Sequence, residues 1–147
     1  MTTATASLED LTLDLTQELE IKAPVGDVYR SMIHEISHIM GGDGQAMDLV
    51  LEAWPGGRWF RDLGHGQGHL WGFVQVIKPP TLLEITGPMM MSYAVAGFLQ
   101  MRLAQISGGT LMTLRHQAIG MIDPKHREGL SQGWGKIIQR IKEGAEK

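Results

Sequence analysis

The hydrophobic period of this sequence changes three times along the chain, and these changes limit the folds that it can adopt. Apolar and polar residues alternate over residues 11–21, which is typical of a half-buried strand. From Val25 onward, apolar residues recur every three or four positions, as in an amphipathic helix that ends at the glycine pair 41–42. Alternation returns near residue 47, and a second helical stripe follows Asp123. One face of a strand-rich sheet must be covered in such a chain, and the stripe of the last helix can cover it.

Short turns separate the six strands that we expect between residues 47 and 121. The turns are rich in glycine and proline and lie at 55–57, 64–68, 79–80 and 107–109. Strands joined by connections this short pair in an antiparallel sheet. With the strand at 11–21, the sheet then has seven strands. The expected boundaries of the later six are 47–53, 58–63, 69–78, 81–86, 94–106 and 110–121.

The last helix should be long and should lie across the sheet. Asp123 is a suitable N-cap and Pro124 suits the first helical position, so we expect this helix at 123–145. Its apolar stripe consists of Leu130, Trp134, Ile137, Ile138 and Ile141. The predicted fold class is α+β, a helix-grip architecture in which a curved seven-stranded antiparallel sheet wraps around a long C-terminal helix, with a short helical segment near the N-terminus. Such a sheet leaves room for a small-molecule cavity against the helix.

Glycine is frequent in the chain, with 19 of 147 residues, and three glycines lie within the expected last helix. Each of them, Gly129, Gly133 and Gly135, costs about 1 kcal/mol relative to alanine in a helix interior. Either packing offsets this cost or the helix approaches another group closely.

Composition and charge narrow the functional classes. A chain of 147 residues fits one domain, and we expect a flexible tail at 1–10 and a single domain at 11–147. The absence of cysteine excludes a disulfide scaffold, a thiol nucleophile and a cysteine-based zinc site. The 13 basic and 16 acidic residues give no electrostatic footprint for nucleic acid, and no apolar run is long enough for a membrane span. The first ten residues lack the features of a signal peptide, so we expect a cytoplasmic protein.

Four motifs in order resemble those of a known superfamily. They are PGGRWF at 55–60, the segment from Gly72 through VIKPP at 76–80 to Leu83, GGTLMTLRH at 108–116, and Gly133 with Trp134 in the last helix. Together they resemble the START-like (SRPBCC) superfamily over residues 12–145, and within it the branch named for the activator of heat-shock protein 90 ATPase. The resemblance implies the helix-grip fold and an internal apolar cavity for a lipid-like, aromatic or polyketide-like ligand. It implies no single activity, because members include ligand carriers, cyclases and chaperone regulators.

The sequence departs from the pattern of that branch at two places. Many members carry a tryptophan pair between the first helix and the second strand, where this chain has HIMGG at 38–42. Many have a bulky aromatic residue after the strand at 81–86, where this chain has Gly87. Both departures would enlarge or reshape the cavity.

The segment HEISH at 34–38 matches the zinc-protease pattern H-E-x-x-H, in which His34 and His38 would hold the metal and Glu35 would act as base. The third ligand of the longer pattern is missing, because its position is Gly44. The two histidines also lie opposite the apolar stripe of the helix and should face solvent. We therefore expect neither a metal site nor a cofactor.

His116 is the leading candidate for a polar group inside the cavity. On the strand at 110–121 it shares a parity with Met112, Leu114 and Ala118, which form the more apolar face. A histidine there could hydrogen-bond a ligand or move a proton, and burial would hold its pKa below the usual value of about 6.5. The alternative is a core histidine held by a backbone carbonyl.

Trp59 and Arg61 share a parity on their strand. If Trp59 faces inward, as the PGGRW motif implies, Arg61 lies at the cavity mouth and could bind a carboxylate or phosphate. The alternative is an arginine on an edge strand that reaches out to water. The other candidate cavity walls are Trp71, Phe73, Phe98, Met101, Met112 and Trp134. The methionines at 89–91, with Tyr93, form either a lid near the entrance or a loop packed on the core.

These observations favour a protein that encloses an apolar or amphipathic small molecule and that has a homodimer as a possible assembly. One alternative is a cyclase or hydrolase in which His116 acts with Arg61 or Glu84. Another is an interaction module that stimulates a chaperone ATPase. A mainly apolar cavity favours the carrier, convergent polar groups with perturbed pKa values favour the enzyme, and an exposed apolar patch with little cavity favours the interaction module.

Overall fold

The computed structural model describes residues 7–147, and its elements follow the changes of period in the sequence. Strands form where apolar residues alternate, and helices form where they recur every three or four positions. In chain order the elements are α1 (Leu8–Leu11), β1 (Thr12–Ile21), α2 (Val25–Ile36), β2 (Leu49–Leu51), β3 (Arg58–Gly64), β4 (Gln67–Lys78), β5 (Leu82–Thr86), β6 (Val95–Ile106), β7 (Gly109–Gly120) and α3 (Pro124–Ala145).

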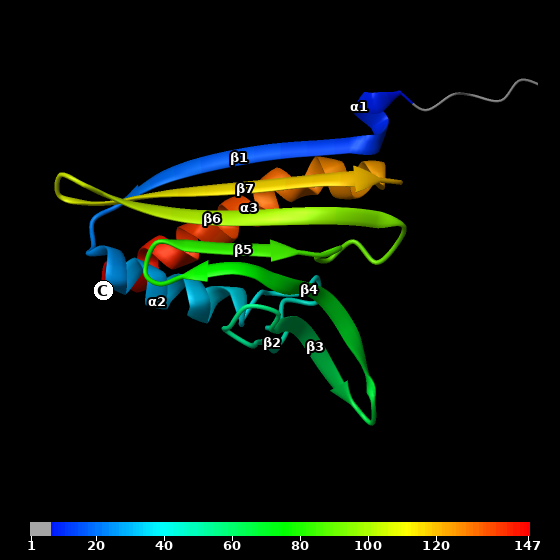
Figure 1. Ribbon diagram of the computed structural model, residues 1–147, viewed down its shortest axis with the longest axis horizontal. Helices are drawn as coiled ribbons and strands as arrows, with labels where there is room; N and C mark the ends of the chain where they lie inside the picture. Colours follow the sequence, from blue (N-terminus) through cyan, green and yellow to red (C-terminus); the bar gives the residue numbers. More distant parts are fainter. Residues whose placement is uncertain (1–6) are drawn as a thin grey trace, which may run out of the picture.

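The seven strands form one antiparallel sheet in the order β1-β7-β6-β5-β4-β3-β2. Because the turns are short, consecutive strands from β2 to β7 are neighbours, and β1 closes the other edge beside β7. The sheet is curved, and the β3–β4 hairpin bends away from the other strands (Figure 1). These features confirm the predicted architecture. One inward row across the sheet joins Leu15, His116, Leu99 and Ile85, so the histidine lies among aliphatic side chains.

The helix α3 lies across one face of the sheet, with α2 beside its C-terminal half (Figure 1). The side chain of Asp123 accepts the backbone N–H of Lys125, and Pro124 occupies the first turn, as predicted. The whole predicted stripe of α3 is buried, including Trp134, Ile137 and Ile141. The apolar stripe of α2 is buried against the same core, which is continuous across both helices and the sheet.

Two polar contacts fix α3 against its neighbours. Gln17 interrupts the apolar alternation of β1, and its side-chain amide donates to the backbone oxygen of Ser131 over 2.7 Å. On the other side, the hydroxyl of Ser31 in α2 donates to the backbone oxygen of Ile141 over 2.7 Å. The helices approach closely at this point, because a β-carbon added to Gly144 would lie 2.6 Å from the Ser31 hydroxyl.

The connection between α2 and β2 differs from the prediction. The helix ends at Ile36, before the glycine pair at 41–42, and β2 spans only Leu49–Leu51. Between them the chain folds back on itself, with Met40 and Ala46 paired as an isolated bridge. Backbone hydrogen bonds from Met47 to Ile39 and from Gly41 to Gln45, both 2.7 Å, close this return. The spacing of apolar residues does not reveal such backbone hydrogen bonds. For this reason the sequence pattern predicted a longer helix and a longer strand.

A β-bulge interrupts the pairing of β3 with β4. Trp59 opposes Gly72 and Phe60 opposes Leu70, so Trp71 is an extra residue on β4. An extra residue reverses the inward and outward parity of the strand beyond it. Trp71 is consequently buried, whereas Phe73 is 45% exposed on the outer face.

At the start of the described chain, Ser7 and Asp10 cap α1 reciprocally through their side chains. Of the tail predicted at 1–10, residues 1–6 lie outside the described residues. Within residues 7–147, no helix combines the length and the apolar character that crossing a membrane requires.

Candidate functional site

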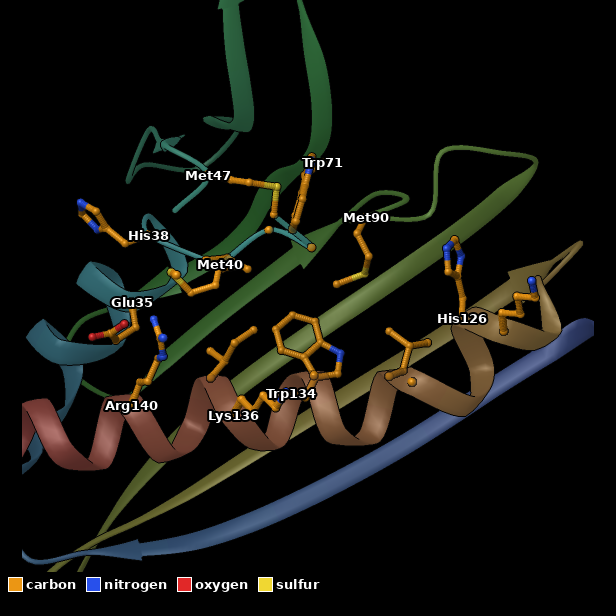
Figure 2. Close-up of a pocket in the computed structure, with 18 residues that line it drawn as sticks. Glu35, His38, Met40, Met47, Trp71, Met90, His126, Trp134, Lys136 and Arg140 are labelled. Carbon is orange, nitrogen blue, oxygen red and sulfur yellow. The ribbon is translucent and has the colours of Figure 1, made fainter. Parts of the chain in front are cut away.

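A cavity of about 430 Å³ lies between α3 and the connection that follows α2. This volume falls within the range of about 300–1,000 Å³ that is usual for small-molecule sites. Figure 2 shows its lining residues, which come from α3, the end of α2, residues 38–47, β4 and the loop after β5. They are Glu35, His38, Ile39, Met40, Gly41, Gly42, Met47, Trp71, Met90, Lys125, His126, Gly129, Leu130, Gly133, Trp134, Lys136, Ile137 and Arg140.

The walls of the cavity are mainly aromatic and aliphatic. Trp134 rises from α3, and Trp71 lies across the cavity from it on β4 (Figure 2). Three methionines, Met40, Met47 and Met90, complete the side that faces α3. Methionine is flexible and polarizable, so these walls can adapt to apolar molecules of different shapes.

The folded-back connection between α2 and β2 positions two of these methionines. Met40 belongs to the isolated bridge with Ala46, and Met47 is held by its backbone bond to Ile39. Gly44, at the tip, has φ of +79°, a left-handed conformation that favours glycine. The tight return therefore places both side chains over α3.

The polar residues of the cavity lie at its two ends. Lys136 and Arg140 border one end, where Arg140 extends from α3 toward the part of α2 that carries Glu35 (Figure 2). Lys125 and His126 border the other end. No carboxylate oxygen within residues 7–147 lies within 4 Å of the three cationic side chains.

His126 is held by a tyrosine. The Tyr93 hydroxyl lies 3.0 Å from Nδ1 of His126, and the two rings are stacked with centroids 5.4 Å apart. The oxygen of Tyr93 also accepts the backbone N–H of Asp123 over 3.1 Å, so this one hydroxyl joins the His126 ring to the start of α3.

Of the site residues predicted from the sequence, the structure brings Trp71 and Trp134 to the cavity. Trp59, Met101 and Met112 face inward as expected, but they are buried in the core away from the cavity lining. Trp59 supports the wall from behind: its ring packs edge to face on Trp71 at 5.0 Å, and its indole N–H donates to the backbone oxygen of Ile36 over 3.1 Å.

His116 is buried on the predicted face, one step behind the cavity wall. Its Nδ1 accepts the indole N–H of Trp134 over 3.0 Å, so its partner is a side chain rather than a backbone carbonyl. Burial lowers the pKa of His116 from 6.5 to about 4, as predicted in direction. Within the described residues 7–147, Nε2 of His116 is the buried side-chain nitrogen that has no hydrogen-bond partner.

Three predicted positions need correction. Phe73 lies on the outer face because the bulge at Trp71 reverses the parity of β4. Phe98 also lies outside, because it alternates with the buried residues Leu99 and Met101 on β6. Arg61 does not line the main cavity; it borders a separate hollow of about 170 Å³, which shares Gly41, Gly42 and Met47 with that cavity.

The groups named for an enzyme do not converge. Glu84 accepts a hydrogen bond from the amide of Gln100 over 2.6 Å on the face opposite to His116. In the HEISH segment, the rings of His34 and His38 stack with centroids 4.3 Å apart, and both are exposed. Across residues 7–147, no group of three His, Cys, Asp or Glu side chains is placed to hold a metal ion.

Sequence reasoning missed most of the polar and small residues of the cavity. His126 and the cations of α3 lie beside the buried stripe, where a helix normally presents solvated residues. The glycines of α3 were a usable signal, since Gly129 and Gly133 both line the cavity. The absence of the family's tryptophan pair at residues 38–42 was a second usable signal, because Gly41 and Gly42 line the cavity where bulkier side chains would fill it. The departure at Gly87 does not enlarge the cavity: a β-carbon there would lie 2.4 Å from the backbone of Gly72.

Comparison with known proteins supports the fold. No protein-family model matches the chain, and no curated protein matches its sequence. Among solved structures, it is similar to an uncharacterized protein from Rhizobium leguminosarum, with 20% identity, a TM-score of 0.70 and coverage of 92% of this chain and 95% of that one. It is also similar to the Aha1 protein from Colwellia psychrerythraea, solved as a dimer, with 14% identity, a TM-score of 0.63 and coverage of 91% and 96%.

A third similar structure is the di-domain ARO/CYC protein StfQ from the steffimycin biosynthetic pathway. Identity is 17% and the TM-score is 0.65, and the match covers 95% of this chain and 52% of that one. Proteins with such different descriptions share the arrangement of sheet and helix found here. The chain therefore has the START-like helix-grip fold that its sequence motifs predicted.

Proposed function

We propose that this protein binds an apolar or amphipathic small molecule in the cavity between α3 and the connection after α2. The observation that carries the proposal is the cavity itself: about 430 Å³, with Trp71 and Trp134 as walls and three methionines opposite α3. A space with this lining excludes water from the surface of an apolar molecule, and burial of apolar surface contributes roughly 25 cal/mol per Å².

A neutral apolar dye, N-phenylnaphthylamine (NPN), tests this function by fluorescence titration. Met90→Trp should fill part of the cavity and weaken NPN binding about tenfold, since overpacking a formed site costs on the order of 1–3 kcal/mol. Met121→Trp is the matched control, because Met121 is 68% exposed and lies outside the cavity. Equal NPN affinity in the two variants, or no binding by the unmodified protein, would count against the proposed site.

A second candidate function is acid–base chemistry on the bound molecule. It is favoured by His126, which borders the cavity and is held through Nδ1 by Tyr93. This histidine replaces His116 as the candidate group, because His116 lies behind the wall. Native mass spectrometry of the protein and of His126→Gln, purified from the same host, distinguishes the two functions. A different retained molecule in the variant would support catalysis, and the same molecule in both would support a carrier.

We also propose where this protein acts and how it assembles. A small-molecule carrier of this kind would act in the cytoplasm, alone or as a homodimer. Support for a dimer comes from the Colwellia psychrerythraea structure, which is described as a dimer. Sedimentation of the purified protein over a range of concentrations measures the assembly directly.

A further inference from the structure

The side of α3 that faces the cavity combines glycines with cations. Gly129 and Gly133 lie one turn apart in the middle of this side, and Lys136 and Arg140 continue it toward the C-terminus. The helix thus presents bare backbone at the centre of the cavity and two positive charges at one end.

The two glycines have no packing role of their own. A β-carbon added to Gly129 or Gly133 would meet no heavy atom within 4 Å, in contrast to Gly144, where the helices approach closely. Each glycine nevertheless costs about 1 kcal/mol of helix stability relative to alanine. Both glycines are exposed, and the space that their missing side chains leave belongs to the cavity, where a bound molecule can use it.

The charges at the Arg140 end are unbalanced. Like charges one helical turn apart repel each other, and neither Lys136 nor Arg140 has a carboxylate oxygen within 4 Å in the described part of the chain. Glu35 is the acidic residue that lines the cavity at this end; its side chain is 17% exposed and lies 3.7 Å from His34. Two cations and one carboxylate leave one excess positive charge, in a chain whose formal net charge is -3.

The other end of the cavity is closer to neutral. Lys125 is its cationic residue, and the carboxylate of Asp123, which caps α3, lies in the same turn and accepts the backbone N–H of Lys125 over 2.8 Å. An anionic group is therefore favoured at the Arg140 end.

We propose that the ligand is an apolar molecule with a single anionic group, such as a carboxylate, whose body lies against Gly129 and Gly133 while Lys136 and Arg140 bind the anion. This inference rests on the proposed function and specifies the chemical class of its ligand. Guanidinium and ammonium groups provide charge-assisted hydrogen bonds to a carboxylate, and the bare helix lets an aromatic or aliphatic body approach the backbone closely.

Two dyes test the charge requirement. Anilinonaphthalene sulfonate (ANS) has the same aromatic body as NPN and adds one sulfonate, so the difference in their affinities reports the anion alone. We expect ANS to bind more tightly than NPN, and the difference to shrink as salt is added. Lys136→Gln combined with Arg140→Gln should weaken ANS binding about fivefold more than NPN binding, while Glu35→Gln should strengthen ANS binding. The matched charge control is Lys78→Gln with Arg102→Gln, two exposed residues outside the cavity.

Gly133→Ala tests the position of the body, with Gly135→Ala as the control on the same helix, because Gly135 does not line the cavity. The first variant should weaken both dyes about tenfold, and the second should leave both unchanged. The anionic ligand is wrong if NPN binds at the cavity but ANS binds no more tightly than NPN. It is also wrong if the cavity and control charge variants change the affinity for ANS equally. In both cases the proposed function stands. If Gly133→Ala binds both dyes normally, the body does not lie on α3. If neither dye binds the unmodified protein, the proposed function fails as well.

Discussion

The indole N–H of Trp134 donates to Nδ1 of His116 over 3.0 Å, and the two rings meet edge to face with centroids 5.6 Å apart. Trp134 is a wall of the cavity, and His116 lies midway along β7, the strand next to the edge strand β1. The bond therefore fixes the orientation of a cavity wall on α3 from the sheet behind it. We infer that His116 is a positioning residue for Trp134 rather than a contact of the ligand.

A double-mutant cycle on this pair measures the bond. His116→Leu leaves the buried Trp134 N–H without its acceptor, while Trp134→Phe removes the donor. We expect a coupling free energy of about 1–2 kcal/mol in chemical unfolding, because the second substitution costs less once the first has been made. Single-variant effects that simply add within about 0.3 kcal/mol would show that the bond contributes nothing to stability.

The low pKa of His116 makes the stability of the protein depend on pH. Its pKa is about 4 in the folded protein against 6.5 for an unperturbed histidine, so folding favours the neutral ring. The contribution of the neutral His116 ring to the free energy of unfolding is complete above pH 6.5, and it is lost as the pH falls toward 4. By pH 5 the loss should be about 2 kcal/mol relative to pH 7.5.

The carboxylates of the chain also titrate in this range, so the comparison is with His116→Leu at each pH. The difference in the free energy of unfolding between the unmodified protein and His116→Leu should decrease by about 2 kcal/mol between pH 7.5 and pH 5. An advantage that stays constant, or an NMR titration of the ring that gives a pKa near 6.5, would place His116 in contact with solvent.

Truncation of Trp134 tests the architecture. Trp134→Ala should lower the free energy of unfolding by about 3–5 kcal/mol, the usual cost of emptying a buried aromatic site. Urea denaturation measures the change. A loss below about 1 kcal/mol would mean that α3 does not pack on the sheet through this residue.

The glycines of α3 should respond to alanine with opposite signs. Gly129→Ala should raise the free energy of unfolding by about 0.5–1 kcal/mol, because the added methyl group meets nothing and improves helix propensity. Gly144→Ala should lower it, since Ser31 must move and its hydrogen bond to Ile141 is disturbed. Thermal unfolding of both variants gives the signs, and a destabilised Gly129→Ala would show that its site is already filled.

The HEISH segment leads to a prediction about metal. His34 and His38 stack on each other and are exposed, and the ring of His38 already uses Nδ1 with the backbone oxygen of His34 at 2.7 Å. We expect no stoichiometric zinc in untagged protein by elemental analysis. One zinc per chain that is lost in His34→Ala would overturn this expectation.

The sequence predicted the fold because strand and helix periods are local properties. The stripe of α3 and the inward parity of His116 on β7 depend only on spacing, and both are confirmed. The prediction for β4 was wrong at Phe73 because a single extra residue, Trp71, is enough to reverse a strand, and no spacing rule marks it.

The candidate site was less predictable than the fold, since it depends on how distant segments meet. Met40 and Met47 reach α3 only because residues 38–47 fold back through their own backbone bonds. His126 and Arg140 lie at the edge of the buried stripe, where the pattern of a helix does not distinguish a cavity from solvent. The glycines of α3 were the sequence signal for the cavity. A glycine in a helix indicates either close packing or open space, and only the structure shows which of the two applies.

The most direct test of ligand binding in this cavity is the NMR response of the four tryptophan indole N–H signals to saturating NPN. Trp71 and Trp134 line the cavity, Trp59 lies in the core behind it, and Trp54 is 58% exposed elsewhere. We predict large shifts for the signals of Trp71 and Trp134, a small shift for Trp59 and none for Trp54. A shift confined to Trp54, or no shift in any of the four signals, would contradict it.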